Sequence, residues 1–173
     1  FVISPGALTH TKGPQNVVSA SRFYSDVAPT VFIGDGDMRE ELEAVLGDRG
    51  RMLGFVPHRD KDALIEAATV LAAAPVKQEH FGIIYVEALA AGTVPVAYGG
   101  GGVDTIVTPD VGVLTERTPH DLGDAVRQVL LDDARREELE AAGRARAQQL
   151  FDNRTIGDRF VAWVEQIAAA GAG

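Results

Sequence analysis

Short apolar runs alternate along the chain with longer segments in which apolar residues recur every three to four positions. The short runs are typical of buried strands, and the periodic segments are typical of amphipathic helices. We expect strands at residues 1–4, 31–33, 51–55, 70–74, 94–98 and 111–114. We expect helices at residues 14–24, 37–46, 60–68, 83–91, 103–107, 119–131, 132–150 and 153–169.

Strands and helices that alternate in this way predict an α/β domain. The expected fold is a Rossmann-like, doubly wound parallel sheet of about six strands with helices on both faces. Such sheets bind their ligands outside the carboxyl ends of the strands. The loops at those ends are residues 5–13, 34–37, 55–58, 75–82 and 98–102.

Several local signals refine the helix ends and faces. Pro14 suits the first turn of its helix, Asp37 with Glu40 predicts a capping box, and Asn153 predicts an N-cap. The periodicity of the last helix predicts that its apolar residues point inward, and these are Ile156, Phe160, Val161, Val164 and Ile167. The Ala/Gly tail, residues 168–173, is expected to fray.

Composition narrows the class of protein. The net charge is −9 and no Lys/Arg-rich run occurs, which argues against a nucleic-acid partner. Cysteine is absent, so disulfides and thiolate metal sites are excluded, which fits a cytoplasmic protein. No apolar run reaches the ~18–20 residues of a membrane span without charge, proline or several glycines, and no signal peptide is visible. Because the chain opens on Phe1 within an expected strand, we expect it to be an excised part of a longer chain.

Residues 79 to 103 carry the strongest chemical signal. Glu87 is the only charged residue between Ile83 and Val103, and a carboxylate in apolar surroundings is costly to bury without a partner. Glu79 stands eight residues earlier, where a loop turns into a helix. Backbone amides at a helix start attract anions, while carboxylates accept from hydroxyl groups. The stretch therefore suits a sugar nucleotide, which carries both phosphates and hydroxyls.

This stretch resembles the retaining GT-B glycosyltransferases of group 1 (family 4), whose hallmark is a pair of glutamates eight residues apart. The matching residues stand in family order and are Glu79, Phe81, Gly82, Ile83, Glu87, Ala88, Ala90, Gly92, Pro95 and Val96. The resemblance implies one half of a GT-B fold, with residues 1–173 as the donor-binding domain. It also implies an N-terminal acceptor domain in the same longer chain, onto which the last helix often crosses back.

The resemblance implies a role for each glutamate and for the helix start. The residue at Glu87 accepts hydrogen bonds from the ribose hydroxyls, and the residue at Glu79 holds hydroxyls of the donor sugar. The amides of Phe81, Gly82 and Ile83 hold the sugar and the distal phosphate. His80, beside Glu79, either touches the donor sugar or faces solvent.

Other family positions match in part. Lys12 with Gly13 corresponds to a lysine that contacts the diphosphate, but the arginine expected five residues earlier is Ala7 here. The family's glycine pair is Gly101-Gly102, and the glutamate that follows it is replaced by Thr105. The loop at Phe55-Val56 resembles the segment whose backbone touches the nucleobase.

Plainer explanations stay open at this point. The helix dipole alone could favour Glu79, Glu87 could pair with an arginine, Lys12 could be a solvated loop lysine, and residues 99–102 could be a flexible turn. Asp35-Gly36-Asp37 is formally a metal-binding D-x-D, although helix capping explains Asp37 better. The four histidines show no metal-ligand spacing.

The sequence therefore predicts the donor-binding domain of a retaining glycosyltransferase. The enzyme would move a hexose from a nucleoside diphosphate sugar to an acceptor hydroxyl without a metal or other cofactor. Peripheral membrane association would run through the missing domain. A non-catalytic sugar-nucleotide-binding or regulatory module is the alternative, favoured by Ala7 and Thr105. A domain for another nucleotide is a second alternative, although no G-x-G-x-x-G follows the first strand.

Overall fold

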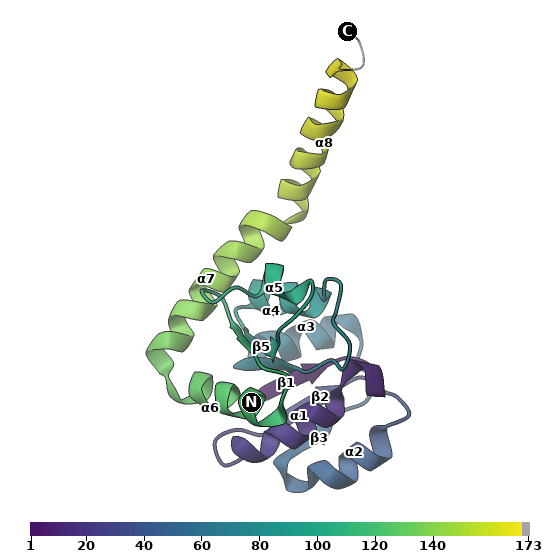
Figure 1. Ribbon diagram of the computed structural model, residues 1–173, viewed down its shortest axis with the longest axis vertical. Coiled ribbons are helices and arrows are strands. Elements are labelled where there is room, and N and C mark those ends of the chain that lie inside the picture. Colours follow the sequence, from purple (N-terminus) through teal and green to yellow (C-terminus); the bar gives the residue numbers. More distant parts are fainter. Residues whose placement is uncertain (171–173) are drawn as a thin grey trace.

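The computed structural model describes residues 1–170 and contains one six-stranded sheet (Figure 1). All neighbouring strands are parallel, and their order is β3-β2-β1-β4-β5-β6. The strands are β1 (Val2–Pro5), β2 (Thr30–Ile33), β3 (Gly50–Met52), β4 (Val70–Ala73), β5 (Val94–Tyr98) and β6 (Val113–Thr115). This order confirms the predicted doubly wound sheet, because the chain returns to the centre after β3 and then builds outward in the other direction.

Helices connect the strands and extend the chain beyond β6. The α-helices are α1 (Pro14–Ala20), α2 (Arg39–Leu46), α3 (His58–Ala67), α4 (Ile83–Ala91), α5 (Val103–Ile106), α6 (Pro119–Leu131), α7 (Asp133–Phe151) and α8 (Asn153–Ala170). The short 3-10 helices found within residues 1–170 are η1 (His10–Lys12), η2 (Ser21–Phe23) and η3 (Gly47–Arg49). None of the helices in residues 1–170 combines the length and the hydrophobicity needed to cross a bilayer.

The hydrophobic core has two parts, one on each face of the sheet. Successive strand residues point to opposite faces, so Phe32 belongs to one part and Ile33 to the other. The first part joins the sheet to α1, α2 and α6, while the second joins it to α3, α4 and α5. Helix α7 contacts both parts through Leu139 and Ala147. The sheet therefore lies between two helical layers. Because its strands are parallel, the loops that follow them lie along one edge of the sheet.

Three local predictions are wrong. The capping box at Asp37 does not form, because Met38 N donates to the Leu8 carbonyl and Arg39 N to the Gly36 carbonyl, so backbone oxygens take the place of the side-chain cap. Helix α8 is capped by Asp152 rather than Asn153, with Asp152 Oδ1 2.9 Å from the amide of Arg154. Strand β3 ends at Met52, three residues earlier than predicted.

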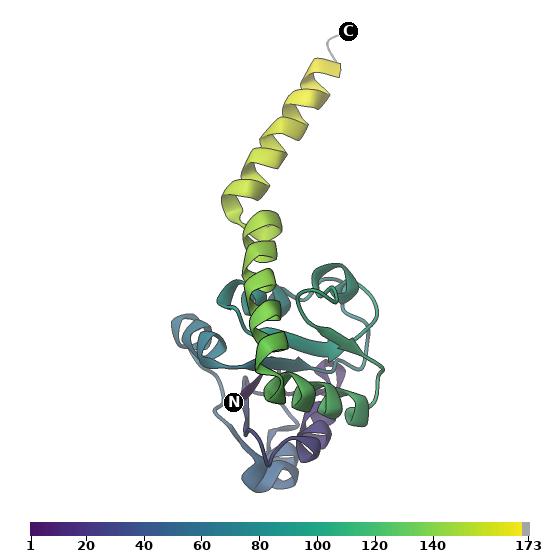
Figure 2. The same cartoon turned by 90° about the vertical axis from the view of Figure 1, so that its left-hand side faces the viewer.

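The last helix departs most from expectation. Helix α8 extends away from the body of the molecule (Figures 1 and 2), so its apolar residues are exposed rather than inward. Trp163 is 56% exposed and Phe160 is 60% exposed, with their rings 6.0 Å apart. The helix therefore carries an apolar patch, and the predicted burial of these residues is wrong. Of the tail expected to fray, residues 168–170 instead continue helix α8, and residues 171–173 lie outside the described part.

Candidate functional site

A cavity of about 690 Å³ opens at the carboxyl edge of the sheet. It lies between the loop after β1 and the segment that leads from β4 into α4. Six of the predicted site residues line it together, and they are Lys12, Glu79, His80, Phe81, Gly82 and Ile83. The structure therefore brings the predicted cation, the first glutamate and the start of the central helix into one site.

An ion pair joins the two loops that form the mouth of this cavity. Lys12 Nζ lies 2.5 Å from Glu79 Oε1, with the lysine side chain 52% exposed and the glutamate 15% exposed. Backbone contacts support the pair, because Val76 N donates to the Thr11 carbonyl over 3.0 Å. Asn16 Nδ2 donates to the Ala74 carbonyl over the same distance. Lys12 is thus fixed against Glu79 rather than solvated alone.

The start of α4 requires glycine at position 82. Gly82 is the N-cap residue with φ of 83°, and a Cβ there would lie 2.5 Å from the Tyr85 ring and 2.9 Å from Glu79 Oε2. In the described part of the chain, the amides of Phe81 and Gly82 donate to no other group. Together with the first turn of α4, they leave unpaired N–H groups at the cavity, which suits an anion.

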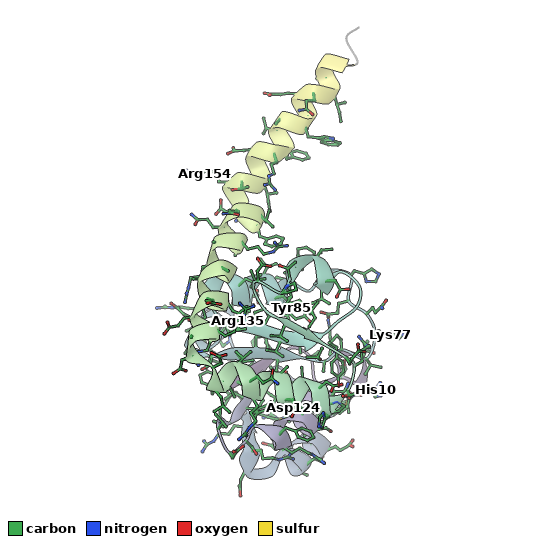
Figure 3. All side chains as sticks on the ribbon, turned by 60° about the vertical axis from the view of Figure 1, so that its left-hand side comes forward. His10, Lys77, Tyr85, Asp124, Arg135 and Arg154 are labelled. Atoms are coloured by element: carbon green, nitrogen blue, oxygen red, sulfur yellow. The ribbon has the colours of Figure 1, made fainter. Side chains whose placement is uncertain are left out.

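Tyr85 is a lining residue that the sequence motifs did not single out. Tyr85 lies within the body of the molecule (Figure 3), where its side chain is fully buried. Within residues 1–170 its hydroxyl has no hydrogen-bond partner. Burial raises the pKa of this hydroxyl, and the nearby negative charge of Glu79 raises it further. Tyr85 is therefore a neutral hydroxyl with unused hydrogen-bonding capacity beside the cavity. An aromatic side chain in an apolar helix is typical of a core residue. The sequence therefore does not indicate that Tyr85 lines a binding site.

The loop of four glycines after β5, residues 99–102, contacts the backbone of Glu79 and is called the glycine loop. Gly102 N donates to the Glu79 carbonyl over 2.8 Å, and Glu79 forms an isolated β-bridge with Gly101. A Cβ at Gly102 would lie 1.7 Å from the His80 carbonyl, so no side chain fits there. Thr105 Oγ1 donates to the Gly102 carbonyl over 2.8 Å. These residues hold the Glu79 segment, and none of Gly101, Gly102 and Thr105 lines the cavity.

Glu87 lies outside the lining of the cavity, one helical turn beyond Ile83. Its partner is a lysine rather than the arginine considered above, with Lys61 Nζ 2.5 Å from Glu87 Oε1. Phe55 is 83% exposed and Val56 packs against the core, so neither reaches the cavity. Lys61 was not predicted, although it is one of only three lysines in an acidic chain.

Arg117, just after β6, was also missed. Its guanidinium donates to the carbonyls of Gly99 and Val76 over 3.2 and 2.9 Å, and to that of Pro75. It also lies over the Tyr98 ring, 5.4 Å from the centroid. A single side chain thereby ties the loop after β4 to the loop after β5. One arginine in a polar loop gives no sequence signal for such contacts.

The formal D-x-D lies elsewhere. Asp35 Oδ1 accepts from the Gly36 amide over 2.9 Å, Asp35 pairs with Arg39 at 3.6 Å, and neither Asp35 nor Asp37 lines the cavity. Among residues 1–170, no three of the His, Asp and Glu side chains gather in a way that could hold a metal ion.

Comparison with known proteins now assigns the family. The sequence model described as "Glycosyl transferases group 1" matches residues 1–146. The chain belongs to this glycosyltransferase family. A solved structure has the same fold: Anabaena HepE, crystallised with UDP and glucose, superimposes with a TM-score of 0.83 at 25% identity. The match covers 96% of this chain and 48% of HepE.

Two curated relatives of this chain are also named as glycosyltransferases. A D-inositol 3-phosphate glycosyltransferase of Xylanimonas cellulosilytica is 34% identical over 159 residues, which is 86% of this chain and 38% of that protein. A phosphatidyl-myo-inositol mannosyltransferase of Mycobacterium tuberculosis is 32% identical over 145 residues, which is 80% of this chain and 38% of that protein. The chain thus spans well under half the length of the curated relatives it matches.

Proposed function

We propose that this chain is the donor-binding domain of a retaining, metal-independent glycosyltransferase. The reaction moves a hexose from a nucleoside diphosphate sugar to an acceptor hydroxyl. One observation carries the proposal: Lys12, Glu79 and the free amides at the start of α4 line one cavity at the carboxyl edge of the sheet. The UDP, UDP-glucose and glucose in crystals of HepE support the assignment of a nucleotide sugar as ligand.

Two kinds of group in the cavity bind different parts of the donor. The diphosphate lies against Lys12 and the unpaired amides of Phe81 and Gly82, because these offer positive charge and N–H donors. The hexose lies beside Glu79 and His80, where the carboxylate accepts from sugar hydroxyls. Lys12 stabilises the negative charge that builds on the leaving phosphate in the transition state. This stabilisation accelerates transfer.

The nucleoside extends away from the cavity along α4. Ile83 lines the cavity and Glu87 follows one turn later, so the ribose lies near Glu87. The loop with Phe55 and Val56 precedes α3, which packs beside α4, and this loop takes the nucleobase. Phe55 is well suited to that role, since its ring is exposed and able to stack on a base.

The acceptor comes from an N-terminal domain in a longer chain. The exposed apolar face of α8, with Phe160 and Trp163, supports this proposal because a face of that kind is normally covered by a partner. Alone, the chain binds donor and transfers poorly. The mycobacterial relative supports a mannosyl donor.

A non-catalytic sugar-nucleotide-binding module is the second candidate. Two observations favour it. Ala7 lines the cavity where the family has an arginine, which removes one cation from the site. Lys12, the remaining family cation, is already paired with Glu79. Both features weaken stabilisation of the leaving group more than they weaken donor binding.

A thermal-shift screen against UDP, GDP, ADP and their sugar conjugates tests donor binding. A specific ligand stabilises the fold by about 2.7 kcal/mol at a hundredfold excess over Kd. We expect one base to dominate and its stabilisation to survive chelation by EDTA. Glu87→Gln should lower nucleoside diphosphate affinity at least about tenfold with the fold retained. If none of the nucleotides stabilises the chain, the proposal is wrong.

A further inference from the structure

Glu87 has one oxygen that is paired and one that is not. Lys61 Nζ lies 2.5 Å from Glu87 Oε1, and the two side chains are 17% and 29% exposed. Glu87 Oε2 is buried, and no group in the described part of the chain hydrogen-bonds to it. A buried acceptor without a partner is costly in a folded protein. The arrangement therefore leaves one acceptor free for a ligand.

The position of this pair matches one part of a nucleotide. Lys61 lies in the first turn of α3, directly after the loop that we assign to the nucleobase. Glu87 lies on α4, one turn beyond the residues that we assign to the phosphates. In a nucleoside diphosphate, the ribose connects the base to the phosphates. The pair therefore sits where the ribose belongs.

Lys61 has more hydrogen-bond donors than its contact with Glu87 uses. Its ammonium carries three N–H groups. One is directed at Glu87 Oε1, and the next acidic neighbour, Asp62 Oδ1, is 3.8 Å away and exposed. At least one N–H can therefore reach a hydroxyl group. The carboxylate and the ammonium together present one acceptor and one donor side by side.

We propose that Lys61 is a second ribose-binding residue and that the Lys61–Glu87 pair, rather than Glu87 alone, recognises the vicinal diol. One hydroxyl donates to Glu87 Oε2, and its neighbour accepts from Lys61 Nζ. This inference rests on the proposed function and sharpens it, because the sequence predicted that the hydroxyls would be held by Glu87 alone. Lys61 thereby becomes a determinant of ribose over deoxyribose.

Calorimetry with Lys61→Met tests the proposal, because methionine keeps most of the side-chain length and removes the charge and the donors. The probes are the tightest binder among UDP, GDP and ADP and its 2′,3′-dideoxy counterpart. We expect the variant to lose about tenfold in affinity for the ribose form and less than about twofold for the dideoxy form. Arg136→Met is a matched control, since the Arg136–Glu140 pair in α7 is similarly exposed, at 20% and 25%. It should leave both affinities unchanged.

A second measurement needs no variant. The chain has three lysines, Lys12, Lys61 and Lys77, so reductive methylation followed by mass spectrometry reports on each one. The ribose form should protect Lys61 more than the dideoxy form does, whereas both forms should protect Lys12 equally.

Three results separate the explanations. Equal losses for both probes in Lys61→Met, with equal protection of Lys61, would mean that the lysine only joins α3 to α4. Tighter binding of the ribose form by Lys61→Met would mean that Lys61 competes with the diol for Glu87. Either result overturns the inference. Failure of the unaltered chain to bind any of the three nucleotides would instead overturn the proposed function.

Discussion

Lys12 Nζ lies 2.5 Å from Glu79 Oε1, so the cation assigned to the diphosphate and the carboxylate assigned to the sugar are partners in one ion pair. Lys12 is half-exposed and Glu79 is mostly buried. A donor that reaches Lys12 must share or replace this contact. The two side chains are therefore coupled, and changes at one alter the charge that the other presents to the donor.

Lys12→Ala should weaken nucleoside diphosphate binding by roughly 1.5–3 kcal/mol, as expected for a charged hydrogen bond. The free nucleoside should lose much less, because it has no phosphate. Calorimetric titrations of both ligands measure the difference. Equal losses would show that Lys12 supports the loop through Glu79 and does not bind phosphate.

Glu79→Ala should weaken binding of the sugar nucleotide and leave the free nucleoside diphosphate nearly unaffected. The reason is that the carboxylate faces the part of the cavity assigned to the hexose, whereas the free diphosphate keeps its contacts with Lys12 and with the amides at the start of α4. Competition titrations with the conjugate and the free diphosphate compare the two ligands. A parallel loss in both would rule out a role in holding the sugar.

Arg117→Ala should loosen the segment that carries Glu79. The guanidinium donates to carbonyls of Val76 and Gly99, which flank that segment and the glycine loop behind it. We expect sugar-nucleotide affinity to fall about tenfold and the melting temperature to fall by about 2–6 °C. Arg117→Lys should not restore either, because an ammonium cannot reproduce the planar donor geometry.

A control with the same kind of contacts is Arg49→Ala. Arg49 donates to the carbonyls of Leu46 and Val18, away from the cavity lining. This change should lower the melting temperature without altering donor affinity. If both variants change donor affinity alike, the Arg117 effect is one of general stability.

The sequence predicts the bounds of some helices and strands better than those of others, and the reasons are physical. Strand β5 (Val94–Tyr98) and helix α6 (Pro119–Leu131) have the bounds predicted. The first is a continuous apolar run buried on both faces, and the second begins with Thr118 as N-cap and proline in the first turn. In such elements the local pattern agrees with the tertiary fold.

Two of the failures depend on contacts that the local sequence does not specify. The start of α2 depends on the Leu8 carbonyl, which comes from another loop, and the periodicity of α8 predicts an apolar face without saying what covers it. The same limit applies to the site. Family spacing located Lys12 and Glu79, but nothing in the sequence paired them with each other, and nothing paired Lys61 with Glu87.

Buried tyrosines predict a loss of stability at high pH. Tyr24 is fully buried, its hydroxyl lies 3.0 Å from Thr30 Oγ1, and burial raises its pKa from 10.0 to about 12. The folded state therefore holds this proton more tightly than the unfolded state does. Stability from Tyr24 is complete below pH 10 and is lost as pH rises towards 12.

Tyr24→Phe isolates this contribution. Below pH 10 the variant should be less stable by about 0.5–1.5 kcal/mol, because the hydrogen bond to Thr30 is lost. Above pH 10 its stability should fall less steeply than that of the unaltered chain, by up to about 1.4 kcal/mol per pH unit. Urea denaturation from pH 8 to 11.5 measures both. Parallel pH profiles would contradict the assignment.

Ala7→Arg should strengthen diphosphate binding by supplying the cation that the family pattern has and this chain lacks. Ala7 is exposed and lines the same cavity as Lys12, so an arginine there can reach a phosphate without entering the core. The net charge of −9 gives no general attraction for an anionic donor, so a local cation should have a large effect. We expect affinity for the nucleoside diphosphate to rise about tenfold and to fall more steeply with salt.

The free nucleoside is the internal control for Ala7→Arg, and its affinity should not change. Ala7→Gln, which is shorter, polar and neutral, should give a smaller gain without the added salt dependence. A gain that is equal for nucleoside and diphosphate would indicate a contact with the base or ribose. No gain at all, with the fold intact, would mean that the loop after β1 does not direct position 7 towards the phosphates. The replacement of the family arginine by Ala7 would then have no effect on donor binding, and it would no longer favour a non-catalytic module.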